Sequence, residues 1–210
     1  MLNILPNENA CMKFANSPAS FQTHQDLWEY LLVAYPDAEL NEKITGEKKL
    51  FCKAHHYALS TDTKPCITLA GFLLKEPMEE IIIKWIQNIC RLHGCFGVTL
   101  NNFSGFPPHT IYLRVQDPQP FEKLAHSLKI IDRFIQSNDC PPLHQASKPH
   151  LTLASGLPEL IYTKAIREYA QKSFHGSFIV DKLVLLKRDA SAKCRLVNTF
   201  GLAAAPAYFN

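Results

Sequence analysis

The sequence predicts an α+β fold in which two similar lobes, each an antiparallel β-sheet with helices on its outer face, are related by a pseudo-twofold axis. A seven-residue stretch occurs twice, at residues 64–70 and 148–154, and five of its seven positions are identical. Around each copy, strand-like segments of period two alternate with segments of helical period. No long linker divides the halves. We therefore expect one bilobal domain over residues 27–210, preceded by an irregular arm over residues 1–26.

The first half begins with an expected strand over residues 27–35, an apolar run that ends at the turn signal Pro36-Asp37. Residues 38–55 favour a helix, and Gly46 leaves open whether this helix is continuous or broken. After the first copy of the repeat, an amphipathic helix is expected over residues 77–94, because a proline and two glutamates suit its start and a glycine its end.

A β-hairpin is expected next, with strands at residues 95–100 and 110–115 and a connecting loop at 101–109 that contains Gly105 and two adjacent prolines. Apolar residues at helical spacing then predict a helix over residues 120–137. The second half is expected to follow the same order, with the second copy of the repeat, a helix over 158–173 and strands over 178–186 and 195–202.

Composition excludes several classes of protein. At 47% hydrophobic and 20% charged residues, the chain can bury a core, and its net charge of +3 permits an anionic ligand without indicating a broad nucleic-acid surface. The seven cysteines form no Cys-x-x-Cys pair, which indicates reduced thiols and no metal site. Since no signal peptide or apolar run of membrane-spanning length occurs, we expect a cytoplasmic protein that needs no membrane. We expect it to be a monomer.

The repeat itself carries the candidate functional residues. Proline suits the first residue of a strand, and the residues after it alternate between polar and apolar side chains. Because residues i and i+2 of a strand share a face, His150 and Thr152 point the same way, as do Cys66 and Thr68. One such segment alone is most often structural. Two copies predict that the pseudo-twofold axis brings both polar pairs to the walls of one groove.

The second copy, His150-Leu151-Thr152, resembles the His-x-Thr/Ser signature of the 2H phosphoesterase superfamily, which includes RNA 2′,3′-cyclic phosphodiesterases and the so-called 2′-5′ RNA ligases. The resemblance extends over roughly residues 27–202. It includes the Phe-containing hairpin segments 96–100 and 106–113 and a closing strand pattern at 180–186. It implies the 2′-5′ RNA ligase-like fold. The first copy departs from the family, because Cys66 occupies the position where family members carry a histidine.

By this resemblance, His150 would be one catalytic acid/base and Thr68 and Thr152 the phosphate anchors, with Cys66 at the second proton-transfer position and no metal or cofactor required. A thiol can donate a proton but reaches less far than an imidazole, and losing one general acid or base costs about 10²–10⁴-fold in rate. The implied function is a weakened cyclic phosphodiesterase acting on a cyclic or 2′-linked phosphate of an RNA end or nucleotide. The alternatives are a non-catalytic phosphate- or nucleotide-binding module, a cysteine nucleophile activated by His150, and a purely structural role.

Other residues offer weaker candidates, each with two interpretations. His109, in the predicted hairpin loop, could supply a replacement imidazole or could simply be exposed. Lys64 and Lys148 each precede a motif and could attract an anion, although solvated lysines are more common. Tyr112 and Phe72 could stack on a nucleobase or pack in the core.

Overall fold

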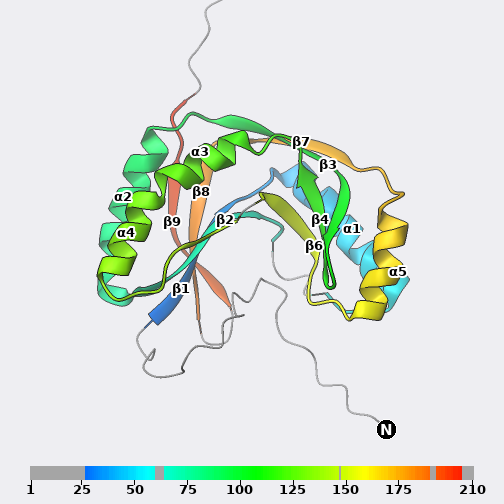
Figure 1. Cartoon of the computed structure of the whole chain (residues 1–210). Helices are drawn as coiled ribbons and strands as arrows, with labels where there is room; N and C mark the ends of the chain where they lie inside the picture. Colours follow the sequence, from blue (N-terminus) through cyan, green and yellow to red (C-terminus); the bar gives the residue numbers. More distant parts are fainter. Residues whose placement is uncertain (1–26, 60–63, 147, 190–192, 205–210) are drawn as a thin grey trace, which may run out of the picture.

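In the computed structural model, which describes residues 27–59, 64–146, 148–189 and 193–204, the chain forms one antiparallel sheet of nine strands with helices packed against it (Figure 1). The expected arm over residues 1–26 lies outside the described residues. The strands are β1 (Leu27–Ala34), β2 (Ile67–Lys75), β3 (Phe96–Phe106), β4 (Thr110–Val115), β5 (His144–Gln145), β6 (His150–Ala154), β7 (His175–Val180), β8 (Lys182–Arg188) and β9 (Cys194–Gly201). The helices are α1 (Ala38–His55), α2 (Glu79–Arg91), which follows the short 3-10 helix Glu76–Met78, α3 (Gln119–Ser127), α4 (Lys129–Ser137) and α5 (Glu159–Tyr169).

The expected α+β class and antiparallel sheet are confirmed, and the two halves are continuous with each other. The strand order β7-β3-β4-β6-β2-β1-β8-β9 divides into two four-stranded halves that meet where β6 pairs with β2. Among the described residues, the register partners at this junction are Ile67 and Leu151, the central residues of the two motifs. The pseudo-twofold axis predicted from the repeat therefore passes between the two copies.

A bulge at the same position of each copy supports this symmetry. The pairing of β2 with β1 skips Leu69, and the pairing of β6 with β4 skips Leu153. The flanking pairs are Val33–Thr68 and Leu32–Ala70 in one half, and Tyr112–Thr152 and Ile111–Ala154 in the other. Because a bulge changes which side chains face the core, the shared bulge gives both motif strands the same local geometry.

The helices cover both halves from the core side of the sheet. Helices α1 and α5 contact strands β3, β4, β6 and β7, whereas α2 and α3 contact β9 and β2. Helix α1 therefore leaves strand β1 of one half and covers the other half. Asp37 caps its first turn by accepting a hydrogen bond of 2.9 Å from the amide of Leu40. Gly46 does not break this helix, which runs without interruption for 18 residues.

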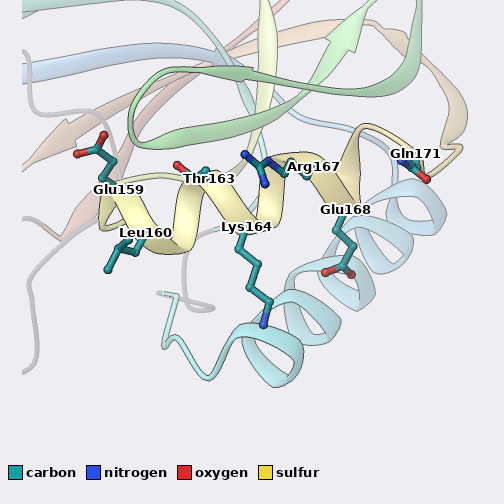
Figure 2. Close-up of a pocket in the computed structure, with 7 residues that line it drawn as sticks. All are labelled: Glu159, Leu160, Thr163, Lys164, Arg167, Glu168 and Gln171. Atoms are coloured by element: carbon teal, nitrogen blue, oxygen red, sulfur yellow. The ribbon is translucent and has the colours of Figure 1, made fainter.

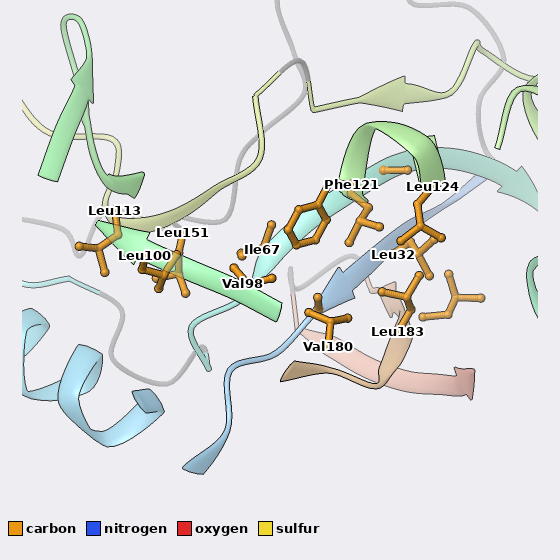
Figure 3. Packing of buried hydrophobic residues seen from close by; sticks show 14 of the residues in the cluster. Leu32, Ile67, Val98, Leu100, Leu113, Phe121, Leu124, Leu151, Val180 and Leu183 are labelled. Carbon is orange, nitrogen blue, oxygen red and sulfur yellow. The ribbon is translucent and has the colours of Figure 1, made fainter. Parts of the chain in front are cut away.

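One hydrophobic core joins the halves (Figure 3). Buried residues of β3, β4 and β6 lie in the same cluster as buried residues of β1, β2 and β8 and of helix α3. The residues labelled in the figure are Val98, Leu100, Leu113, Leu151, Leu32, Ile67, Val180, Leu183, Phe121 and Leu124. Ile67 and Leu151 both belong to this cluster, which fixes the orientation of the motif residues on either side of them.

Three predicted elements need correction. The hairpin loop is shorter than expected, because β3 continues to Phe106 through an irregularity at Asn102, where φ is 54°. The helix predicted over residues 120–137 is two helices that meet at Leu128. The strand predicted over 178–186 is two strands in opposite halves, separated by Asp181 alone. Within the described part of the chain, no helix has the length and apolar character to span a membrane.

Candidate functional site

The four motif residues lie together on the face of the sheet that is opposite the helix-covered core. Since Ile67 and Leu151 point into the core, the residues before and after each of them point to the other face. An antiparallel pair at these two residues places Cys66 beside Thr152 and Thr68 beside His150. All four side chains are half-buried. We call this surface the open face. The structure thus brings the predicted residues of both copies to one place.

His150 is held in a defined orientation by its own backbone. Its Nδ1 atom lies 2.8 Å from the carbonyl oxygen of Lys148. A carbonyl oxygen only accepts hydrogen bonds, so in the neutral ring Nδ1 carries the proton and Nε2 keeps its lone pair. Burial lowers the pKa of His150 below its usual value, and the hydrogen bond to Lys148 opposes this shift in part. The side chain is therefore a neutral base near neutral pH.

Two aromatic rings border His150 on the open face. The ring of Phe106 stacks on that of Tyr112 with 4.3 Å between the centroids, and each centroid lies 5.0 Å from that of His150. Tyr112 is among the candidates that the sequence offers, whereas Phe106 enters there only as part of the hairpin segment 106–113 and not as a candidate site residue. Phe106 faces the same way as Tyr112 because both continue the alternation of the β3–β4 hairpin. The alternation of β3 is interrupted at Asn102, so no continuous strand pattern in the sequence leads to Phe106.

The surroundings of Cys66 are different. Cys66 packs against a small apolar cluster on the open face, formed by the buried side chains of Leu31, Val33 and Val184, with Tyr35 and Leu186 also at its edge. The ring of Tyr35 has the Nζ atom of Lys64 at 4.8 Å from its centroid. The two halves thus present unlike environments at symmetry-related positions. Mostly aliphatic side chains, with Tyr35 at the edge, surround the thiol, and two aromatic rings border the imidazole.

The structure adds a cationic side chain near His150, Arg114, to the two lysines named from the sequence. It is the register partner of His150, so the two side chains leave the sheet on the same face. Its Nε atom donates a hydrogen bond of 3.3 Å to the carbonyl oxygen of Asn101. Lys64 and Lys148 are both exposed, as expected for lysines at the ends of motif strands.

The remaining candidates, His109 and Phe72, lie where their side chains have structural contacts. His109 is exposed at the tip of the hairpin, with its Nδ1 atom 3.0 Å from the hydroxyl oxygen of Thr110. Phe72 is buried in the core and stacks on Tyr30, so it offers no ring to a ligand. Among the described residues, no group of three or more His, Cys, Asp or Glu side chains is arranged to bind a metal ion.

A pocket of about 680 Å³ lies elsewhere, along the outer side of α5 (Figure 2). Its lining residues are Glu159, Leu160, Thr163, Lys164, Arg167, Glu168 and Gln171. No motif residue lines it, and its acidic and basic side chains are mixed. The pocket is therefore separate from the open face.

The chain is similar to known proteins in both sequence and structure. A candidate phosphoesterase from Shouchella clausii is 24% identical over 174 residues, which are 81% of this chain and 96% of that protein. A candidate phosphoesterase from Bacillus cytotoxicus is 25% identical and is covered to 95% of its length. Among solved structures, TT0787 of Thermus thermophilus has a TM-score of 0.63 at 15% identity, covering 84% of this chain and 98% of that one. LigT from E. coli has a TM-score of 0.62 at 18% identity, with coverage of 85% and 99%.

These structural similarities show a shared fold. The family assignment comes from the model of the 2′-5′ RNA ligase superfamily, which matches residues 36–192. This span contains both copies of the repeat and the junction of β2 with β6, around which the sheet is built. The chain belongs to the 2′-5′ RNA ligase superfamily.

Proposed function

We propose that the open face is a phosphodiester site for a cyclic or 2′-linked phosphate of an RNA end or a nucleotide. In this proposal His150 is the catalytic acid/base, Thr68 and Thr152 bind the phosphoryl oxygens, and Cys66 occupies the second proton-transfer position. The observation that carries it is the junction at Ile67 and Leu151, which brings both motifs to one face. The names of the sequence relatives as candidate phosphoesterases support it, and so do solved complexes of LigT with phosphate and with 3′-AMP.

The geometry supports a base role for His150. Hydrolysis of a cyclic phosphate needs a group that takes a proton from water and a group that protonates the leaving sugar oxygen. Nε2 of His150 carries a lone pair in the neutral tautomer, and the lowered pKa keeps that tautomer populated at neutral pH. The threonine hydroxyls flank the junction and can donate hydrogen bonds to oxygens on which charge builds up.

Cys66 is the reason to expect slow catalysis. A thiol lies closer to the backbone than an imidazole nitrogen does, and here it packs with aliphatic side chains. If the second proton transfer lacks an efficient group, the rate falls by about 10²–10⁴-fold. The same observation favours the second candidate function, a non-catalytic module that binds a phosphate or nucleotide through the remaining residues.

Hydrolysis of a panel of nucleoside 2′,3′-cyclic phosphates and of short RNAs with 2′,3′-cyclic ends tests this proposal. The variants are Cys66→His, Cys66→Ala and His150→Ala, measured beside the wild type. Cys194→Ala is the control for loss of a thiol, since Cys194 is exposed on β9, and His109→Ala is the control for loss of an imidazole. Calorimetric titration with phosphate and with 3′-AMP accompanies each activity measurement.

We expect weak hydrolysis by the wild type, a gain in Cys66→His and loss in His150→Ala, with both controls unchanged. Binding without hydrolysis in the wild type, together with activity in Cys66→His, would favour the binding module. An effect of His109→Ala as large as that of His150→Ala would move the catalytic imidazole to the hairpin tip. Neither binding nor hydrolysis by any variant would overturn the assignment of the open face.

A further inference from the structure

We infer that Phe106 is the residue on which the nucleobase of a nucleotide ligand stacks, so that this ring makes the site selective for nucleotides over phosphate esters without a base. The inference rests on the proposed phosphate site at His150 and adds to it a determinant of specificity that neither the repeat nor the motif contains. It is carried by the position of the ring, its contacts and its burial.

Phe106 lies beside the proposed reacting centre. It is the last residue of β3 and the register partner of Thr110, next to the exposed turn at residues 107–109. Its ring centroid is 5.0 Å from that of His150, with the planes at 78° to each other. A ligand whose phosphate meets Nε2 of His150 therefore has an aromatic surface next to it, and the base of a nucleotide is attached to the same sugar as a 2′- or 3′-phosphate.

The contacts of Phe106 leave it suited to stacking. Tyr112, which is largely buried, stacks against the ring at an interplanar angle of 23° and so supports it from one side. Phe106 itself is half-buried and belongs to neither hydrophobic cluster of the described residues. A large aromatic side chain that remains partly exposed, outside the core and held by a second ring, is typical of a platform for a base.

The symmetry of the fold shows that this feature is specific to one half. In the other half, strands β8 and β1 correspond to β3 and β4. Phe106 pairs with Thr110 in the first half, and the corresponding pair in the other half is Leu186 with Leu31. Leu186 belongs to the apolar cluster around Cys66, in which Tyr35 is the one aromatic side chain among the described residues. Because a stacked pair of rings borders His150 on the open face, we assign the base to that half and the sugar–phosphate to the centre.

The test compares the binding of 3′-AMP with that of glycerol 2-phosphate, a phosphate ester of a secondary alcohol without a base, by calorimetric titration. The variants are Phe106→Ala, Phe106→Leu, which keeps most of the apolar volume, and Phe106→Trp, which keeps an aromatic face. Phe134→Leu is the matched control, a half-buried phenylalanine of α4 that packs on Trp85. Thermal unfolding of each variant verifies that it is folded.

We expect the wild type to prefer 3′-AMP, and Phe106→Ala and Phe106→Leu to weaken its binding by about 5- to 150-fold, as for loss of one stacked base. Glycerol 2-phosphate should bind all variants alike, and Phe106→Trp should keep the preference. If the wild type binds both ligands equally, or if Phe106→Leu weakens both equally, Phe106 does not stack on a base and the inference fails while the phosphate site stands. If neither ligand binds, the proposed phosphate site fails, and this inference fails with it.

Discussion

Nδ1 of His150 lies 2.8 Å from the carbonyl oxygen of Lys148, so the residue that introduces the motif also fixes the tautomer of its histidine. The chain bends at Lys148, two residues before the ring. Because the acceptor is a backbone carbonyl, the local backbone leaves Nε2 as the atom that accepts a proton.

The pKa of His150 should consequently be measurable below that of an ordinary histidine. Burial destabilises the charged ring and lowers the pKa from its usual 6.5. We expect the Cε1 proton of His150 to titrate with a midpoint below pH 6.5 in an NMR titration. If His150 acts as the base, kcat/KM rises with pH through that midpoint and is level at neutral pH. A midpoint at or above pH 6.5 would contradict this.

The lowered pKa of His150 also makes the stability of the protein depend on pH. Because the pKa of His150 is lower in the folded than in the unfolded protein, its contribution to stability is present above pH 6.5 and is lost as the pH falls through the folded-state value. Burial lowers the pKa values of His55 and His93 as well, so the acid-induced loss of stability has several sources. The residue-specific NMR titration separates them, and His150→Gln provides the assignment.

Replacing either motif threonine with valine should lower the rate of cyclic phosphate hydrolysis and have little effect on folding. Valine keeps the shape and the strand preference of threonine but removes the hydroxyl donor. We expect Thr68→Val and Thr152→Val each to lower the rate of cyclic phosphate hydrolysis by about 10²–10³-fold, the usual cost of losing one oxyanion donor. Steady-state kinetics on the Cys66→His background gives the signal needed for this measurement.

Thr99→Val is the matched control, because Thr99 is also half-buried in a strand but lies on β3, where its partner is Ser177 of β7. It should leave the rate unchanged. Equal losses in all three variants would mean that valine disturbs the sheet and that the motif hydroxyls have no separate role. An unchanged rate in both motif variants would remove the threonines from the site.

Period and repeat were sufficient to predict most elements and to predict that the two motifs lie close together. They failed where the chain passes from one half of the sheet to the other without a strong turn signal. Phe178 and Val180 alternate with exposed residues, and Leu183 is one residue out of phase with them. The consecutive polar pair Asp181-Lys182 marks the point at which the chain crosses from one half to the other. Single-sequence patterns report which face a residue takes, whereas the choice of neighbouring strand depends on long-range packing.

The candidate site residues could be named from the sequence only in part, for a related reason. A motif residue is recognisable because its type and spacing carry chemistry, so Cys66, Thr68, His150 and Thr152 could be named. Phe106 and Arg114 lie next to His150, and their place there depends on the register of β3 with β4 and of β4 with β6. A bulge at Asn102 sets the register of β3 with β4, and the local sequence does not predict this bulge.

Gly105 should be required for the packing of α5 on β3. A Cβ atom at this position would lie 2.9 Å from Cδ1 of Ile166 and would meet the hydroxyl of Tyr162 even more closely. We expect Gly105→Ala to lower the free energy of unfolding by about 1–3 kcal/mol, the usual cost of overpacking. Urea unfolding measures this, and Gly201→Ala is the control, because no atom lies within 4 Å of a Cβ there.

Adding Tyr162→Phe to Gly105→Ala should recover part of the loss, since it removes the hydroxyl that the new methyl group meets first. Non-additivity in this double-mutant cycle identifies the contact as the cause. If the two substitutions are additive, the cost of alanine at this position comes from another source.

Lys187 should be the most important charged residue for stability. Its side chain is only 1% exposed, and its Nζ atom lies 2.8 Å from Glu76 Oε1 and 3.3 Å from Glu79 Oε2. It also lies 4.4 Å from the ring centroid of Trp28. Tyr30 donates a hydrogen bond of 2.5 Å to the same Glu79 carboxylate. The network ties β1 and β8 to the start of α2.

We expect Lys187→Ala to lower the free energy of unfolding by about 3–5 kcal/mol, because it leaves a cavity as well as a carboxylate without its buried partner. Lys187→Met should cost less, since it fills the space and both glutamates remain partly exposed to water. Urea unfolding at pH 7 measures both, with Lys182→Met, an exposed lysine of the same strand, as the control.

The charge contribution of Lys187 should also depend on pH. The hydrogen bond from Lys187, and then its charge, lower the pKa of Glu76 below its usual 4.5. The stabilisation from this pair is therefore present above pH 4.5 and is lost as the pH falls through the folded-state value. The difference between wild type and Lys187→Met should shrink over that range while the Lys182→Met control stays parallel to wild type. A difference that does not change with pH would assign the role of Lys187 to packing against Trp28 alone.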